Sequence, residues 1–232
     1  MKVAIHQPQY FPYPGFFHKL SLADAFVIMD DTQYDRRYTN RNIIVDPHGP
    51  VWLTVPINKS QKFSPNRLVE INNGIPWRED HWRKIRLSYS NARFFHLYRD
   101  LEWVYNKEWR RLFDLNLEAI KKTMGWLGIK IPVIKESELH VKGESTERLV
   151  RICRSVGADT YVSGAGGKGY IQERLFEENN LKLEYQDYAP TPYSQRFVSA
   201  FVPNLSILDM LFNVGPDSIN LLSGISNPPL SA

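Results

Sequence analysis

The sequence has a single cysteine, Cys153, among its 232 residues. One thiol excludes an internal disulfide framework and is typical of a protein from a reducing compartment. No apolar run approaches the roughly 18 to 20 residues that a membrane span needs. The chain begins with MKVAIHQPQ, which lacks the pattern of a secretory signal peptide. These absences predict a cytoplasmic protein with no membrane span.

The chain also carries little net charge, since the formal net charge is only +4. The basic side chains are unevenly distributed along it, because residues 78–130 hold twelve basic and seven acidic side chains. A basic face can meet nucleic acid, anionic lipid or a phosphorylated small molecule, and it can equally be a solvated helix surface. No stretch combines clustered charge with an exposed aromatic platform, so we expect no nucleic-acid partner.

Strand and helix patterns alternate along both ends of the chain. Residues 2–6 and 25–29 are predicted to be strands, with a short helix at 16–21 between them. The runs 42–45 and 51–55 flank the turn-forming DPHGP and indicate a β-hairpin. Further along, we expect strands at 131–134, 160–162 and 181–186, helices at 149–157 and 170–179, and a last helix that starts with a capping box at Ser206–Asp209 and ends at Gly215-Pro216.

The middle of the chain, at about 77–127, has apolar residues at helical spacing. Predicted strands lie on both sides of it, so we interpret it as an insertion. Repeated strand–helix–strand units favour a parallel sheet. We therefore predict one α/β domain over residues 1–232, with a mainly parallel Rossmann-like sheet, helices on both faces, a β-hairpin and a helical insertion at about 77–127.

The opening stretch IHQPQYFPYPGFFHK, residues 5–19, has too much proline for regular structure and too many aromatic residues for a solvated loop. It follows the first predicted strand. Two other polar segments, DDTQ at 30–33 and SGAGGKGY at 163–170, follow other predicted strands. In an open parallel sheet, ligands bind beyond the carboxyl ends of the strands. The sequence therefore predicts a site where these three segments converge.

The glycine-rich segment favours binding of a phosphate or carboxylate, although a flexible turn would also explain it. Glycines allow backbone N–H groups to face an anion, and Lys168 adds a positive charge. The spacing matches neither the P-loop nor the dinucleotide fingerprint. The candidate residues here are Ser163, Gly164, Gly166, Gly167, Lys168 and Tyr170.

A second anion-binding set follows the second strand. Gln33, Arg36, Arg41 and Asn42 could clamp a ligand, because an arginine side chain offers a two-pronged donor. Solvated surface is the competing interpretation. Asp30 and Asp31 are candidates for catalysis or helix capping, but adjacent residues of a strand point in opposite directions. No set of residues has convincing metal-ligand spacing, so we predict no metal site.

His6 is the main acid–base candidate, because it would lie in the predicted crevice and imidazole exchanges protons near neutral pH. His18 is the weaker choice. Gln7 and Tyr10 could donate hydrogen bonds beside His6.

Several of these motifs together resemble the WbqC-like protein family. The resemblance rests on IHQPQYFP with GFF, on Asp30-Asp31, NRN at 40–42 and WLTVP at 52–56, and on SG, GK and Tyr170 near the glycine loop. It ends with LSILDMLFN at 205–213. The resemblance implies a bacterial protein associated with surface-polysaccharide, especially O-antigen and lipopolysaccharide, biosynthesis.

The resemblance also implies an activity: a transferase that adds an acyl or aminoacyl group to a nucleotide-linked amino sugar. His6 would be the base, and Gln7, Tyr10 or the N–H groups of residues 164–167 would stabilise the oxyanion. No cofactor is expected to be built in, and the donor, such as acyl-CoA or a carrier protein, stays open. Two alternatives remain: an ATP-dependent ligase or nucleotidyl transferase, and a non-enzymatic adaptor of a polysaccharide assembly system.

Overall fold

The computed structural model describes residues 1–224. Its strands are β1 (Lys2–His6), β2 (Ala25–Ile28), β3 (Arg41–Asp46), β4 (Gly49–Thr54), β5 (Val133–Lys135), β6 (Thr160–Ser163) and β7 (Lys182–Tyr185). Its α-helices are α1 (Pro14–Ser21), α2 (Trp77–Tyr89), α3 (Trp103–Asn106), α4 (Leu112–Trp126), α5 (Glu136–Leu139), α6 (Ser145–Ser155), α7 (Glu173–Glu177), α8 (Ile207–Val214) and α9 (Ser218–Leu222). Short 3-10 helices span Lys59–Gln61, Asn66–Leu68, Phe95–Glu102, Ala165–Gly169 and Gly215–Asp217.

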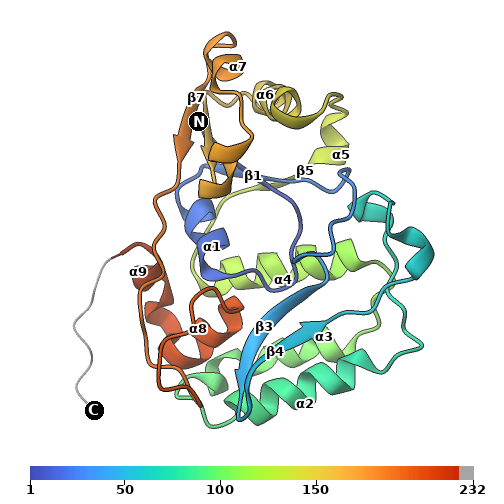
Figure 1. Cartoon of the computed structure of the whole chain (residues 1–232), viewed down its shortest axis with the longest axis vertical. Helices are drawn as coiled ribbons and strands as arrows, with labels where there is room; N and C mark the ends of the chain where they lie inside the picture. Colours follow the sequence, from blue (N-terminus) through green and yellow to red (C-terminus); the bar gives the residue numbers. More distant parts are fainter. Residues whose placement is uncertain (225–232) are drawn as a thin grey trace.

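Five parallel strands form the main sheet in the order β5-β2-β1-β6-β7. β1, β5 and β7 of this sheet are labelled in the upper part of Figure 1. The chain leaves β1 toward β2 on one side and leaves β6 toward β7 on the other. The direction of winding therefore reverses between β1 and β6, which makes the gap between these two strands the topological switch point. The predicted mixed α/β fold with a parallel sheet is confirmed.

The two faces of the sheet pack against different helices, because alternate residues of a strand face opposite ways. Ala4, Phe26 and Ile28 belong to the core cluster that also holds α1, the helical segment and α8. Val3, Ile5 and Val27 belong to the cluster that holds residues of α6 and α7. The sheet is thus flanked by helices, as the sequence predicts.

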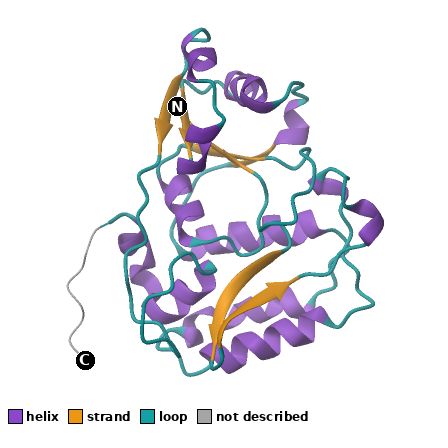
Figure 2. Cartoon of the chain, viewed as in Figure 1, coloured by secondary structure: helices purple, strands orange, loops and turns teal. Residues whose placement is uncertain are grey.

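The predicted hairpin is confirmed as a separate antiparallel pair, β3 and β4. It lies among the helices of the insertion, apart from the main sheet (Figure 2). The Tyr89 hydroxyl of α2 accepts a hydrogen bond from the backbone N–H of Val45, 3.2 Å away. Asn116 of α4 donates to the Thr39 carbonyl at 2.7 Å. The helical middle of the chain therefore supports the hairpin and the segment before it.

Three local predictions need correction. Ser206 accepts a hydrogen bond from Leu208 N at the start of α8, but Asp209 binds side chains of other segments instead of completing a capping box. The helix expected at 170–179 is only Glu173–Glu177. After Gly215, where α8 ends as predicted, a further helix α9 follows.

Two other points concern membrane-spanning helices and the range of described residues. No helix within residues 1–224 is long and apolar enough to cross a membrane. The last eight residues of the predicted domain range, 225–232, lie outside the described residues.

Candidate functional site

The strands β1 and β6 separate at the residue before His6. Their pairing ends at Ala4 and Val162. The carbonyls of Lys2 and His6 accept from residues that flank β2, at 2.8 Å each. Because successive carbonyls of a strand point to opposite sides, the carbonyl of Ile5 points toward β6. This carbonyl marks the switch point.

Lys19 of α1 fills that position. Its Nζ donates a hydrogen bond to the Ile5 carbonyl at 2.9 Å, and its side chain is 2% exposed. No salt-bridge partner of Lys19 occurs within residues 1–224. Burial lowers the pKa of Lys19 to about 7. The site thus holds an amine that is partly neutral at neutral pH.

His6 lies beside Lys19 at the end of β1, with its ring 5.0 Å from that of Phe16. Its Nδ1 is 2.9 Å from the carbonyl oxygen of Gln7. A carbonyl can only accept, so Nδ1 carries the proton and Nε2 has a free lone pair. Burial, together with the Lys19 ammonium, lowers the pKa of His6 to about 3. His6 is therefore a neutral hydrogen-bond acceptor at neutral pH and a weak base.

The loop after β1 is held in one shape by distant residues. Phe11 has a φ of 39°, in the left-handed region that bulky residues rarely adopt. Its carbonyl accepts from Asn42 Nδ2 at 2.7 Å and from Ser206 Oγ at 3.0 Å. Asn42, predicted to contact a ligand, is thus placed as a support of the loop.

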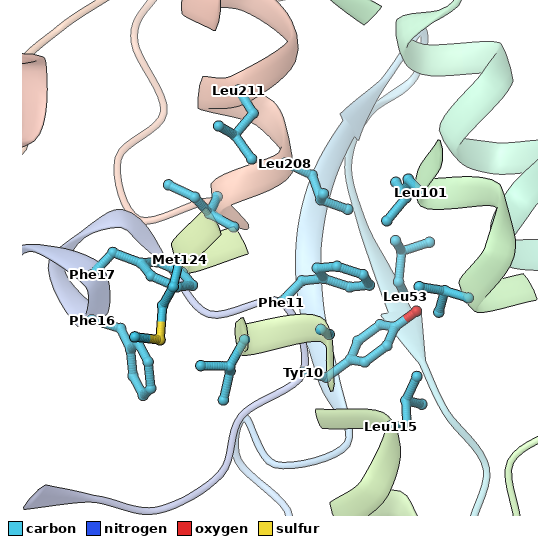
Figure 3. Close-up of a cluster of buried hydrophobic side chains, with 14 of the residues drawn as sticks. Tyr10, Phe11, Phe16, Phe17, Leu53, Leu101, Leu115, Met124, Leu208 and Leu211 are labelled. Atoms are coloured by element: carbon cyan, nitrogen blue, oxygen red, sulfur yellow. The ribbon is translucent and has the colours of Figure 1, made fainter. Parts of the chain in front are cut away.

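Tyr10 points into the hydrophobic core, away from solvent, next to Phe11 (Figure 3). Its hydroxyl is 3.1 Å from Nδ1 of His81 and 2.9 Å from the Tyr105 hydroxyl. These partners belong to the helical segment. The structure therefore gives the Tyr10 hydroxyl a role in packing the loop and no free position as an oxyanion donor.

An aromatic group covers the other side of α1. Tyr188, which follows β7, lies with its ring 6.3 Å from Tyr13 and 5.3 Å from His18. A side chain at Gly15 would come within 2.4 Å of Tyr13 and 2.6 Å of Tyr188, so these rings require glycine there. Burial lowers the pKa of His18, and its Nδ1 has no partner among the described residues.

The glycine-rich loop combines packed and unpacked glycines. A Cβ at Gly167 would lie 2.2 Å from Ser163 Oγ, so the fold itself requires this glycine. A Cβ at Gly164 or Gly166 would meet nothing within 4 Å, and neither has a positive φ. Packing and backbone geometry therefore leave Gly164 and Gly166 unexplained, as expected where a ligand comes close to the backbone.

The polar side chains of this loop lie at the carboxyl ends of β6 and β7. Lys168 is exposed, with Nζ 5.4 Å from the centre of the Tyr185 ring. Tyr170 is 58% exposed. Ser163 is buried, and its hydroxyl donates to the Gly164 carbonyl at 3.2 Å. Lys168 and Tyr170 are accessible to a ligand, whereas Ser163 supports the loop.

The two aspartates after β2 have structural partners. Asp30 is buried and accepts from the backbone N–H and the hydroxyl of Ser137, at 2.8 and 2.7 Å. Asp31 pairs with Arg67 at 2.8 Å and lies 3.9 Å from Arg148. Both carboxylates thus join β2 to neighbouring segments.

The remaining predicted residues lie on the segment between β2 and β3. Arg41 stacks on Trp52 at 4.4 Å and donates to the Arg37 carbonyl at 3.1 Å. Arg36 and Gln33 are exposed, and the backbone of Gln33 forms a bridge with Pro65. The Arg41–Trp52 stack offers a cationic and aromatic surface on the hairpin.

Comparison with known proteins identifies the chain's relatives. The model of the WbqC-like protein family matches residues 7–221. The chain belongs to this family. It is also similar to "Uncharacterized protein Rv1507c" of Mycobacterium tuberculosis (strain ATCC 25618 / H37Rv), with 34% identity over 224 residues, which cover 95% of this chain and 97% of that protein. No solved structure matches it significantly.

In this WbqC-like protein, the structure brings His6, Gln7 and the glycine loop to adjacent strand ends at the switch point. It directs Tyr10, Asn42, Asp30 and Asp31 to structural contacts. Cavities of about 180 and 450 Å³ lie elsewhere, beside Tyr193 and Trp82. Within residues 1–224, no group of three or more His, Cys, Asp or Glu could hold a metal ion.

The sequence predictions for this WbqC-like protein did not include Lys19, whose Nζ lies at the switch point. Lysine is almost never fully buried without a partner, so its residue type alone does not separate Lys19 from the surface lysines. One signal was present: Lys19 follows His18 on a short helix whose other residues are mostly apolar. A polar residue on the buried side of such a helix would have pointed to the crevice.

Proposed function

We propose that this protein is a transferase that adds an acyl or aminoacyl group to the amine of a nucleotide-linked amino sugar. Its setting would be the biosynthesis of bacterial surface polysaccharide such as O-antigen. The observation that supports the proposal is the switch point, where a neutral imidazole with a free Nε2 follows β1 and a glycine loop, in which packing does not explain Gly164 and Gly166, follows β6. An adaptor without catalysis would have no need of this pairing.

The glycine loop is the proposed site for the diphosphate. Backbone N–H groups around Gly164 and Gly166 can approach an anion closely, because no Cβ intervenes. Lys168 can supply a mobile positive charge. The exposed ring of Tyr170 and the Arg41–Trp52 stack offer surfaces on which a base or a sugar can stack.

The proposed chemistry begins with orientation of the attacking amine. His6 Nε2 would accept a hydrogen bond from this amine and aim its lone pair at the acyl carbon. With a pKa of about 3, His6 does not hold the proton that the amine loses. The side-chain amide of Gln7 and N–H groups of the glycine loop would stabilise the oxyanion of the intermediate. The acyl donor would be a thioester of coenzyme A or of a carrier protein.

A thermal-shift panel tests the ligand class. It compares UDP-glucosamine, UDP-N-acetylglucosamine, UDP, acetyl-CoA and ATP with and without magnesium, because a ligand that binds only the folded state stabilises it. We expect UDP-glucosamine to raise the melting temperature more than UDP does. A shift with ATP and magnesium alone would instead indicate a ligase. Absence of any shift would contradict the proposed ligand class.

The role of His6 has its own test. His6→Ala should lower turnover by about 10²-fold or more, because orientation of the amine is lost. His6→Asn, whose side-chain amide can also offer an acceptor, should recover part of the loss. Full turnover in His6→Ala would eliminate the assignment.

A further inference from the structure

Lys19 occupies a position that the fold does not require to be charged. Its side chain is 2% exposed, and its neighbours on α1, Phe16, Phe17 and Leu20, belong to the hydrophobic core. Removing an ammonium group from water is costly unless a partner compensates it. The Ile5 carbonyl accepts one hydrogen bond from Nζ, which can donate three. A leucine or methionine would avoid that cost but would leave the buried Ile5 carbonyl without its donor. A neutral amine can donate to this carbonyl as well as an ammonium can, so the hydrogen bond itself does not require a charge.

The position of Nζ is the second observation. The Ile5 carbonyl points toward β6, at the place where β1 and β6 have stopped pairing. Nζ therefore lies between the ends of the two strands, with His6 next to it on β1 and the glycine loop after β6. This is where an open α/β sheet binds its ligand.

We propose that Lys19 is the acid–base group of this site and exchanges a proton directly with the reacting nitrogen of the substrate. The proposal rests on the transferase function proposed above. It assigns to Lys19 the uptake of the amine's proton, for which His6 is too weak a base. Within the site, His6 would orient the amine and Lys19 would take its proton.

The proposed step balances as follows. The neutral amine of the amino sugar attacks the carbonyl carbon of an acyl thioester, and a carbon–nitrogen bond forms. The nitrogen of the intermediate, now positively charged, gives a proton to the neutral ε-amino group of Lys19. The carbon–sulfur bond then breaks, the thiolate leaves with the electron pair, and the Lys19 ammonium returns the proton to it. The products are an amide and a thiol.

The charge state of Lys19 suits this exchange. Burial is the cause that lowers the pKa of Lys19 to about 7, and a group with a pKa near the working pH exchanges protons most effectively. Among the groups that face it, His6 on β1 is uncharged, and α9, which packs on α1, has the sequence SINLL without ionisable side chains. The negative charge of Asp187 raises the pKa of His18, the residue before Lys19 on α1, and so opposes the effect of burial there.

Competitive acetylation tests both reach and basicity. Purified protein is trace-labelled with acetic anhydride over a range of pH, and acetyl groups on Lys19 and on the exposed Lys130 are quantified by mass spectrometry. The proposal requires that a small reagent can reach Nζ, although Lys19 is only 2% exposed in the structure. If it does, we expect Lys19 to react about ten-fold faster than Lys130 at about pH 7.5, because a lysine with an ordinary pKa is almost entirely protonated there. Labelling no faster than that of Lys130, or a titration midpoint above about pH 9, would overturn the proposal.

The same labelling with UDP-glucosamine present separates this inference from the proposed function. Protection of Lys19 supports both. Fast labelling of Lys19 without protection supports its role as a reachable neutral amine and counts against the amino-sugar nucleotide as its substrate. Failure of one proposal is thus distinguishable from failure of the other.

Two substitutions distinguish an acid–base role from a role for charge alone. Lys19→Met removes the amine but keeps the apolar stem, and Lys19→Arg keeps a charge that does not titrate. We expect both to reduce turnover about 10²- to 10⁴-fold, with loss of the limb of the pH–rate profile that has a midpoint near 7. Lys19→Met also leaves the Ile5 carbonyl without its donor, so its melting temperature is measured together with its turnover. Lys19→Arg can still donate to this carbonyl and decides the question if Lys19→Met is destabilised. Full activity in Lys19→Arg would overturn the proposal, and Lys130→Met serves as the matched control with unchanged turnover.

Discussion

At the scale of the residue, four bases within residues 1–224 hold their protons weakly. His6, His18, His81 and Lys19 have lowered pKa values, and burial is the main cause for each. Burial disfavours the charged form of a base, so each of these groups is more easily protonated in the unfolded chain. The same physical cause therefore gives Lys19 a pKa near neutral and makes the fold sensitive to acid.

His81 gives a prediction for stability against pH. Burial lowers the pKa of His81 in the folded protein to about 4, from an ordinary value of 6.5, so the unfolded state binds more protons between these two pH values. His81 should therefore make the free energy of unfolding fall as the pH is lowered through this window, with a contribution of about 1.4 kcal/mol per pH unit at the steepest. His6, whose pKa is also lowered by burial, adds to the total slope in the same window. Urea denaturation at graded pH measures it. In His81→Gln, which can still bind the Tyr10 hydroxyl, the fall should be smaller, and an unchanged slope would contradict the assignment.

Asn42 gives a second prediction at this scale. It is 1% exposed, and it joins the strained Phe11 turn to β3. Asn42→Ala removes the donor to the Phe11 carbonyl and the acceptor for Ile43 N–H. We expect a loss of about 1 to 3 kcal/mol in the free energy of unfolding. Asn58→Ala, which removes only a 3.5 Å contact with Glu70, is the control and should cost less. An equal cost in both would contradict the bracing role of Asn42.

At the scale of the element, neighbouring glycines of the loop after β6 should behave differently. Gly167→Ala places a Cβ 2.2 Å from Ser163 Oγ and 2.8 Å from Ile171 Cδ1, so it should destabilise the fold by about 1 to 3 kcal/mol. Gly166→Ala meets nothing, so the melting temperature should stay the same while the affinity for UDP-glucosamine falls. Calorimetric titration and thermal unfolding of both variants measure this. Unchanged affinity in Gly166→Ala would contradict close approach of a ligand.

The elements themselves were largely predictable from the sequence, whereas the side chains of the site were not. The buried run at 25–29 and the turn at DPHGP report local periodicity and turn chemistry, which persist in the fold. Tyr10, Asn42 and Asp30 were predicted at the site because strand ends place residues there. Their actual partners, such as His81 and Ser137, come from distant segments that no local pattern reveals. Lys19 was missed because its burial is a property of the tertiary packing.

At the scale of the whole molecule, Cys153 reports on the intact fold. It lies on the face of α6 that packs on the sheet and is fully buried there, and burial raises the pKa of its thiol to about 12. A thiol that stays protonated and buried does not react with disulfide reagents. We expect the native protein to resist Ellman's reagent and to react in proportion to the unfolded fraction as urea rises. Rapid reaction of the native protein would contradict the packing of α6 on the sheet.

The two proposed surfaces lie at different places in the molecule. The switch point lies at the carboxyl ends of β1 and β6. The basic residues of 78–130 belong to the helical insertion (Figure 1). Several of those cations are already paired on the surface, among them Arg83 and Lys84 with Asp80, each at 2.8 Å. An adaptor would use the insertion, and the proposed transferase would use the sheet edge.

Hydrogen exchange followed by mass spectrometry, with and without saturating UDP-glucosamine, tests this central claim most directly. The account predicts slowed exchange in peptides that cover residues 7–13 and 164–170, and no change over α2 and α4. Slowed exchange confined to α2 and α4, or binding that leaves both loops unchanged, would contradict a ligand site between β1 and β6.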